Sequence, residues 1–314
     1  MGEMCRWART LILTVSVEPD DPSVVGRTGA YRSLEGLGRF HELCRRHGVR
    51  PTYLLTYSAA CEARCADAAR AWGVETEFGA HLHPEEVPPI ADGERGNHTL
   101  RPGDVAPERL RAKLVNLLDR VAEATGRRPT SFRSGFFGLT PALAAALGEL
   151  GVEADSSLGP LEKVGQTYPY IGVPFAPYVF DPARCGALIE VPLTSVFRRP
   201  FPRALYGAYV RLPGRVRGAL RACGLAEIVR FRPAAASERD LLAVCERTAR
   251  LGIPAVMTVH SNELWPGTSA AVGSQAASDA YYARLERVLV HARERGWASL
   301  TLTEAARRAR ETAA

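Results

Sequence analysis

Lysine is almost missing from this 314-residue chain, since only Lys113 and Lys163 are found among 40 lysine and arginine residues. Arginine therefore carries nearly all the positive charge, and the formal net charge is +6. The chain also lacks any run of about eighteen apolar residues, so we predict no membrane span. Its first apolar stretch is short and leads into acidic residues, which argues against a secretory signal and favours a cytoplasmic protein.

Cysteine spacing typical of disulfide frameworks or zinc ribbons is absent as well. The seven cysteines are odd in number and scattered along the chain, which fits a reducing compartment. Cys61 and Cys65 lie one helical turn apart, and we assign them no metal or redox role. No internal repeat or low-complexity tract divides the chain. We therefore expect a single domain over residues 1–314.

Positive charge is densest in residues 198–232, where arginines recur within a helix-like segment. We interpret this stretch as a solvated, Arg-rich insertion. The alternatives are a surface for an acidic substrate, a nucleic acid or an anionic membrane. We predict no nucleic-acid partner.

Strand-like and helix-like segments alternate along the chain, which predicts parallel strands joined by crossover helices. The expected strands cover residues 11–17, 52–58, 76–82, 130–133, 152–156, 187–194, 254–261 and 298–302. The expected helices cover residues 33–47, with Ser33 as N-cap, 59–72, 107–125, 141–150, 238–252 and 278–296, before a terminal helix. Residues 85–104 have no periodicity and predict a substrate-binding loop or lid. The expected fold is an α/β barrel.

Two histidines at the end of an expected strand are the most informative chemical feature. His81 and His83 are two residues apart, so their side chains lie on one face of a strand and can converge on one ion. Glu18, which shares a strand face with Ser16, brings a carboxylate to the end of another strand. Two imidazoles and one carboxylate, with a position left open for water, are a known catalytic zinc arrangement.

Two further polar residues follow later strands, at the edge where parallel-strand enzymes place their chemistry. Arg133 lies in the segment SFRSGFFG, and His260 lies in the segment MTVHSNELWPG. A histidine there can act as a general acid, because its charge changes near physiological pH.

The motifs around these residues, taken as a set, resemble those of the polysaccharide deacetylase family, also called the NodB-homology family. They read TVSVEPD (residues 14–20), GAHLHPE (79–85), FRSGFFG (132–138) and VHSNELWPG (259–267). They follow the family's order across residues 11–310 and are closest to an intracellular-looking branch. The resemblance implies a distorted (β/α)7-type barrel and metal-dependent hydrolysis of an acetamido or similar amide group, usually on a sugar.

Residue by residue, the resemblance makes Glu18, His81 and His83 the metal ligands. It makes Arg133 the residue that steadies the catalytic base, and His260 the acid that protonates the leaving amine. The two histidines are closer in sequence than in the commoner family form, where they lie four residues apart. Ser16 occupies the catalytic position of the base, where the family has an aspartate.

This serine is the main departure, because its hydroxyl cannot hold a proton taken from water near pH 7. Another carboxylate would have to act as the base. Arg133 would also lose its anionic partner, leaving a cation free to bind a substrate carboxylate or phosphate. The candidate bases are Asp20, Asp21, Glu85 and Glu86.

Three functional hypotheses follow. The first is a hydrolase that uses zinc or a similar divalent ion on a small N-acylated substrate, with an anionic substrate as one option. The second is a metal-independent ureide or cyclic-amide hydrolase. The third is a non-catalytic protein that binds a ligand in the old pocket. The sequence predicts no oligomeric state.

Overall fold

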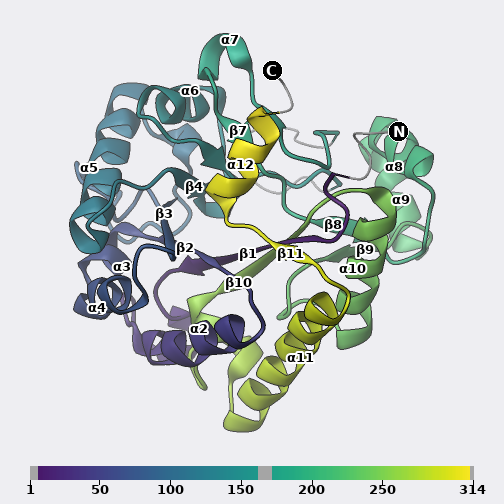
Figure 1. Cartoon of the computed structure of the whole chain (residues 1–314). Helices are drawn as coiled ribbons and strands as arrows, with labels where there is room; N and C mark the ends of the chain where they lie inside the picture. Colours follow the sequence, from purple (N-terminus) through teal and green to yellow (C-terminus); the bar gives the residue numbers. More distant parts are fainter. Residues whose placement is uncertain (1–5, 162–171, 312–314) are drawn as a thin grey trace.

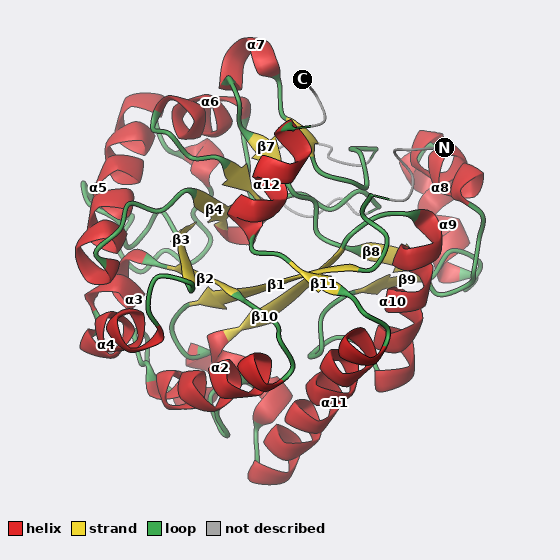
Figure 2. Cartoon of the chain, viewed as in Figure 1, coloured by secondary structure: helices red, strands yellow, loops and turns green. Residues whose placement is uncertain are grey.

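The computed structural model describes residues 6–161 and 172–311. Its centre is a curled sheet with helices packed around the outside (Figure 1, Figure 2). The strand order is β10-β1-β2-β3-β4-β5-β7-β6, and β11 also pairs with β1. The seven strands from β10 to β7 are paired in parallel. The predicted α/β class and seven-stranded distorted barrel are therefore confirmed, in the form of a half-barrel.

The described strands are short apart from β1, β3 and β10. Their bounds are β1 (Thr10–Val17), β2 (Thr52–Leu55), β3 (Glu77–Leu82), β4 (Ser131–Ser134), β5 (Ala154–Asp155), β6 (Tyr178–Val179), β7 (Ile189–Glu190), β8 (Ser195–Phe197), β9 (Ile228–Arg230), β10 (Ala255–His260) and β11 (Ala298–Ser299). Strand β6 pairs antiparallel with β7, and β8 and β9 form a separate antiparallel pair.

Helices follow most of the parallel strands, as crossover connections require. The α-helices are α1 (Pro22–Val25), α2 (Leu37–Arg46), α3 (Tyr57–Cys61), α4 (Ala63–Trp72), α5 (Pro107–Thr125), α6 (Pro141–Glu149), α7 (Pro182–Cys185), α8 (Arg203–Arg211), α9 (Gly214–Ala222), α10 (Glu238–Leu251), α11 (Gln275–Glu294) and α12 (Leu302–Arg310). The 3-10 helices are η1 (Arg32–Gly36), η2 (Pro102–Asp104), η3 (Gly135–Phe137), η4 (Ser261–Glu263) and η5 (Ala270–Val272). None of these helices has the length and apolarity needed to cross a bilayer.

Strand β1 lies between β10 and β2, and all eight of its residues are buried. Its sequence, TLILTVSV, consists mainly of leucine and β-branched residues. Such an uninterrupted run is typical of a strand that is covered on both faces. The register places Ser16 beside His260 of β10, and the register of β3 with β4 places His81 beside Arg133. Segments far apart in the sequence therefore bring their polar side chains to the same end of the half-barrel.

Several predicted boundaries were wrong. The strand expected over residues 52–58 ends at Leu55, because the Thr56 side chain accepts a hydrogen bond from the Ala59 amide and starts α3. The expected helix over residues 59–72 is divided at Glu62, whose backbone is extended. The strand expected over residues 187–194 keeps only Ile189–Glu190.

The helix expected over residues 33–47 begins differently from the prediction. Ser33 is not its N-cap, because the segment opens with the 3-10 helix η1 and Ser33 is buried inside it. The carboxylate of Asp20 accepts hydrogen bonds from the backbone amides of Arg32 (2.8 Å) and Ser33 (3.0 Å). An acidic residue from the loop after β1 thus satisfies the start of this helix, which local sequence does not reveal.

The Arg-rich stretch contains more than helix. It includes α8 and α9, and its last part forms β9, which pairs with β8. No residue of α9 is buried, whereas α8 buries Tyr206 and Tyr209.

Candidate functional site

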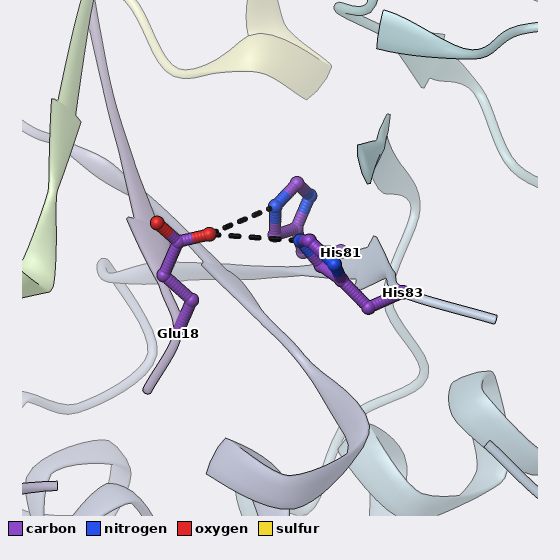
Figure 3. A group of neighbouring side chains, drawn as sticks. All are labelled: Glu18, His81 and His83. Carbon is purple, nitrogen blue, oxygen red and sulfur yellow. Dashed lines mark ion pairs between the residues drawn. The ribbon is translucent and has the colours of Figure 1, made fainter. Parts of the chain in front are cut away.

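Glu18, His81 and His83 converge at the end of the half-barrel, and we call them the strand-end cluster. One Glu18 carboxylate oxygen lies 3.6 Å from Nε2 of His81 and 3.6 Å from Nε2 of His83. One ligand atom from each of the three residues lies within 4.8 Å of the others. Figure 3 shows the carboxylate directed toward the two rings. A single divalent ion could contact all three after small side-chain adjustments.

The second nitrogen of each ring in this cluster also has a fixed partner. Nδ1 of His81 is 3.0 Å from the backbone carbonyl oxygen of Arg133, and Nδ1 of His83 is 3.4 Å from a carboxylate oxygen of Glu85. Metal-binding histidines are held in this way, because an oxygen at Nδ1 selects the tautomer that leaves Nε2 free to coordinate.

The two histidine rings differ in pKa. Burial lowers the pKa of His81 to about 4. Burial acts in the same sense on His83, but hydrogen bonds and charge from Glu18 and Glu85 outweigh it and raise its pKa to about 10. Burial favours neutral Glu18, yet nearby His260, His81 and His83 hold the pKa of this carboxyl well below its usual range. Glu18 is therefore ionised. His83 is protonated near neutral pH without metal, and a cation bound at this cluster would displace the Nε2 proton.

Close backbone packing supports His83 from the side of β4. A Cβ atom on Gly135 would lie 2.5 Å from the Leu82 carbonyl oxygen and 3.1 Å from Nε2 of His83. Glycine is therefore required where the FRSGFFG segment passes the histidine. The Phe136 ring also contacts His83, edge to face, with centroids 5.3 Å apart.

His260 approaches the strand-end cluster from β10. Its Nε2 lies 3.9 Å from the second Glu18 oxygen, and its Nδ1 lies 3.4 Å from a Glu263 oxygen. Glu263 is 1% exposed and also binds the Arg232 guanidinium and the Tyr281 hydroxyl. Burial opposes its ionisation, but His260 and Arg232 prevail and lower the pKa of Glu263 to about 2. The ionised carboxylate thus faces the imidazole as an ion-pair partner.

Ser16, Arg133, Asp155 and Glu190 form a second polar set deeper in the half-barrel, which we call the interior group. Each of the four is at most 1% exposed. Arg133 donates hydrogen bonds to the side chains of Ser16 (3.3 Å), Thr14 (2.8 Å) and Ser156 (3.2 Å) and to the Ser156 carbonyl oxygen (2.8 Å).

The predicted free cation is therefore not found, because Arg133 is sealed from solvent and its donors are used. Burial lowers its pKa to about 10, while the carboxyl groups of Asp155 and Glu190 oppose that shift. Burial also raises the pKa of Asp155, and burial with the Asp155 charge raises that of Glu190 well above its usual range. Burial therefore shifts both acids toward their neutral forms, and the negative charge that remains on the pair compensates Arg133.

Sequence reasoning missed three acidic residues of this architecture. Glu263 stands three residues after His260 within a motif already singled out, and this spacing was an available signal. Asp155 and Glu190 lie on adjacent strands β5 and β7 and face each other in register. Nothing local in the sequence marks them as partners, because they are brought together only by strand pairing.

A cavity of about 750 Å³ opens beside the strand-end cluster. Its volume is within the range of small-molecule sites. Glu18, His83, Glu85 and Glu86 all contribute to its wall. Neither Ser16 nor any other member of the interior group lines it.

The four alternative bases differ in how they are engaged. Asp20 is fully buried and caps η1, and Asp21 caps α1 through hydrogen bonds from Ser23. Glu85 lies against His83 and, at 3.6 Å, against His98. Glu86 is half-buried and accepts hydrogen bonds from Ser58, and burial raises its pKa.

The predicted loop over residues 85–104 forms one wall of the cavity and is anchored at its base. The ammonium of Lys113, which is fully buried, donates to the carbonyl oxygens of Pro84 (2.9 Å) and Val87 (2.7 Å). It also lies 3.0 Å from Glu94 inside the loop. One of the two lysines in the chain thus holds the segment that carries His83, Glu85 and Glu86.

By sequence, the chain matches no family model and no curated protein. Solved structures match its fold over nearly the whole length. A protein from Mycobacterium smegmatis assigned as a polysaccharide deacetylase aligns with a TM-score of 0.60 at 16% identity, covering 98% of this chain and 92% of that one.

Two further structures are similar. A protein from Pseudomonas aeruginosa assigned as a polysaccharide deacetylase has a TM-score of 0.55 at 16% identity, covering 96% and 90% of the two chains. The allantoinase PuuE has a TM-score of 0.58 at 13% identity, covering 97% and 91%. The protein therefore has the fold of the polysaccharide deacetylases, the NodB-homology fold that its strand-end motifs predicted.

Proposed function

We propose that this protein is a metal-dependent hydrolase that removes an acyl group from an amide nitrogen of a small, sugar-like substrate. The observation that carries the proposal is the strand-end cluster beside a cavity of about 750 Å³. Glu18, His81 and His83 offer two imidazole nitrogens and one carboxylate oxygen, a donor set that suits zinc. The oxygen partners at both Nδ1 atoms support the same interpretation.

When bound, a zinc or similar divalent ion supplies Lewis-acid activation of water and of the acyl oxygen. The protein supplies the remaining functions. Glu18 stays ionised and offers its carboxylate to the cation, and His81 and His83 direct their Nε2 atoms to the same point. His260 faces the cluster with Nε2, and Glu263 holds the opposite nitrogen, so His260 is placed to give a proton to the leaving amine.

We propose Glu86 as the base that replaces the aspartate expected at Ser16. All four candidate carboxylates line the cavity, but Asp20 and Asp21 are used as helix caps and Glu85 is paired with His83. A carboxylate whose pKa is raised by burial accepts a proton more readily near neutral pH. Glu86→Gln should abolish turnover while metal content is kept, and Asp21→Asn is the matched control that should retain turnover.

The test of the proposed function begins with the purified protein. Metal content is measured by mass spectrometry, and amine release is followed from N-acetylglucosamine and its nucleotide-linked form. One zinc per chain and chelator-sensitive release of amine are expected. Absence of stoichiometric metal after zinc reconstitution would overturn the assignment.

Ser16→Asp separates an active enzyme from a non-catalytic ligand-binding protein. If the natural protein is inactive and the substitution creates deacetylase activity, the natural chain has lost this chemistry. If the natural protein is active and the substitution reduces its activity, the enzyme works with a changed base. We expect the natural protein to be active and Ser16→Asp to reduce its activity.

The second candidate is a metal-independent ureide hydrolase, favoured by the similarity of this fold to that of the allantoinase PuuE. In this case His260 and Glu18 would act on the substrate directly. Hydrolysis of allantoin that persists after dialysis against a strong chelator would support it. Loss of all activity on chelation, with recovery on zinc addition, would exclude it.

We further propose that residues 1–314 form one domain. Its main hydrophobic core joins residues from Leu11 on β1 to Ala292 on α11. Helix α12 packs in a second cluster that includes Ile12 of β1 and Val256 of β10. Limited proteolysis should release no stable fragment that lacks α12.

A further inference from the structure

Three arginines converge in a pocket between the start of α8 and the end of α10, two helices that lie together at the edge of the molecule (Figure 1). The pocket has a volume of about 320 Å³. Arg203, Arg247 and Arg250 lie in its wall, with Phe201, Tyr206 and Leu251 as apolar and aromatic neighbours. The wall contains no carboxylate. None of these residues lines the cavity beside the strand-end cluster.

The positive charge of this pocket is poorly compensated. Arg203 and Arg250 form no ion pair with any residue that the structure describes. Nη1 of Arg247 is buried and has no hydrogen-bond partner among residues 6–161 and 172–311, whereas its Nη2 donates to the Arg198 carbonyl oxygen. Burial lowers the pKa of Arg247, and the Arg250 and Arg198 guanidiniums act in the same sense, whereas Tyr206 and Asp240 oppose the shift. A buried donor without an acceptor is costly, so an anion would relieve this arrangement.

A second recess shares part of this wall. It has a volume of about 150 Å³ and includes Arg203, Tyr206 and Leu251, the same residues that border the arginine pocket. Its remaining wall is made by Phe175, Gly207 and Ile253. The two hollows together present a cationic compartment next to an apolar one.

We propose that the pocket between α8 and α10 binds an organic phosphate, with the phosphate held by the three arginines and the apolar part in the adjoining recess. Guanidinium groups match phosphate oxygens with paired hydrogen bonds, and three of them can satisfy a dianion. Nucleic acid fits the pocket less well, because Tyr206 is 2% exposed and offers no face for base stacking. The proposal does not depend on the function assigned to the strand-end cluster.

The test uses the full chain and two soluble probes, phenyl phosphate and inorganic phosphate, titrated by calorimetry at physiological ionic strength. Phenyl phosphate should bind about tenfold more tightly than inorganic phosphate, because it also occupies the apolar recess. The double variant Arg203→Gln with Arg250→Gln should weaken binding at least about tenfold. Arg239→Gln, an exposed arginine on the same helix α10 but outside the pocket, is the matched control and should bind normally.

A third probe distinguishes a soluble ligand from a lipid headgroup. Vesicles of phosphatidylcholine, with and without phosphatidic acid, are sedimented with the protein. Arginine-dependent binding of phenyl phosphate alone identifies a soluble ligand, and arginine-dependent binding to the phosphatidic acid vesicles identifies a headgroup. The proposal is overturned if no probe binds, or if the double variant, shown by circular dichroism to be folded, binds as well as the Arg239→Gln control.

Discussion

The strand-end cluster and the interior group share one half-barrel, but their hydrogen bonds leave different atoms available. In the strand-end cluster, the partners of His81 and His83 occupy Nδ1 and leave Nε2 facing Glu18 beside the cavity. In the interior group, Arg133 uses its donors on Thr14, Ser16 and Ser156 and is sealed from solvent. The first arrangement is suited to binding, and the second to structural stability.

The difference explains how the chain accommodates serine at position 16. A buried arginine without a negative partner would be strongly destabilising. Asp155 and Glu190 lie near Arg133 and supply that charge from β5 and β7. Ser16 needs to provide only a hydroxyl group, 3.3 Å from the guanidinium. A serine at this position is therefore compatible with the architecture of the strand-end cluster.

Removing the charge of Arg133 should have the largest effect. It should lower the stability of the fold, which depends on the interior group, and leave zinc binding by the strand-end cluster in place. Arg133→Met leaves the charge of the Asp155 and Glu190 pair without compensation, and we expect the free energy of unfolding to fall by about 3–5 kcal/mol. Zinc affinity should stay within about tenfold, because the carbonyl oxygen that holds His81 belongs to the backbone. Urea unfolding and zinc titration measure the two quantities. A loss of zinc affinity with unchanged stability would contradict the assignment of stability to the interior group and of metal binding to the strand-end cluster.

The opposite result is expected for the strand-end cluster, where a substitution should affect zinc affinity more than stability. Glu18→Gln removes the anionic ligand, and zinc affinity should fall by more than about 100-fold, beyond the effect typical of outer partners. Stability without metal should fall less than in the Arg133 variant, because Glu18 borders the cavity and water can solvate the histidines that lose their partner. Arg95→Gln is the control, since this exposed arginine lines the same cavity but lies outside the cluster. Equal zinc binding by the natural and Glu18→Gln proteins would rule out the cluster as the metal site.

Glu263 has features of both groups. It pairs with His260 beside the strand-end cluster, and like the interior group it is buried. Its pKa is lowered from 4.5 to about 2, so its ionised form stabilises the fold above about pH 4.5, and this contribution is lost as the pH falls toward 2. The shift corresponds to about 3 kcal/mol. In Glu263→Gln, the free energy of unfolding should no longer show this decrease at acid pH. Urea unfolding between pH 2 and 7 measures the difference between the two proteins. An unchanged acid limb would show that the carboxylate is not ionised in this environment.

The oxygen partner of His83 should give the smallest effect. Glu85→Gln keeps the shape of the side chain but weakens its hold on Nδ1, and zinc affinity should fall by about 10–100-fold. Glu62→Gln, an acidic residue outside the cavity, should leave zinc affinity unchanged. Competition with a fluorescent zinc chelator measures both variants. Equal affinities for the two variants would mean that the orientation of His83 does not depend on Glu85.

Local sequence determined much of the central architecture. Buried apolar runs predicted β1, β3 and β10 within a few residues, because consecutive apolar side chains are needed wherever a strand is covered on both faces. The two-residue spacing of His81 and His83 predicted that both rings point the same way, since side chains alternate along a strand. The convergence of these rings with Glu18 was inferred from the ends of parallel strands, and the geometry agrees with it.

Other features were decided only by the tertiary structure. Asp20 caps a helix that begins twelve residues later, and Glu190 lies in register with Asp155 on the neighbouring strand. Both arrangements depend on where the chain returns in space. The sealing of Arg133 has the same origin, because burial depends on neighbours from several strands. Periodicity and spacing report on residues close in sequence, whereas the charge balance of a buried site is set by groups that only folding brings together.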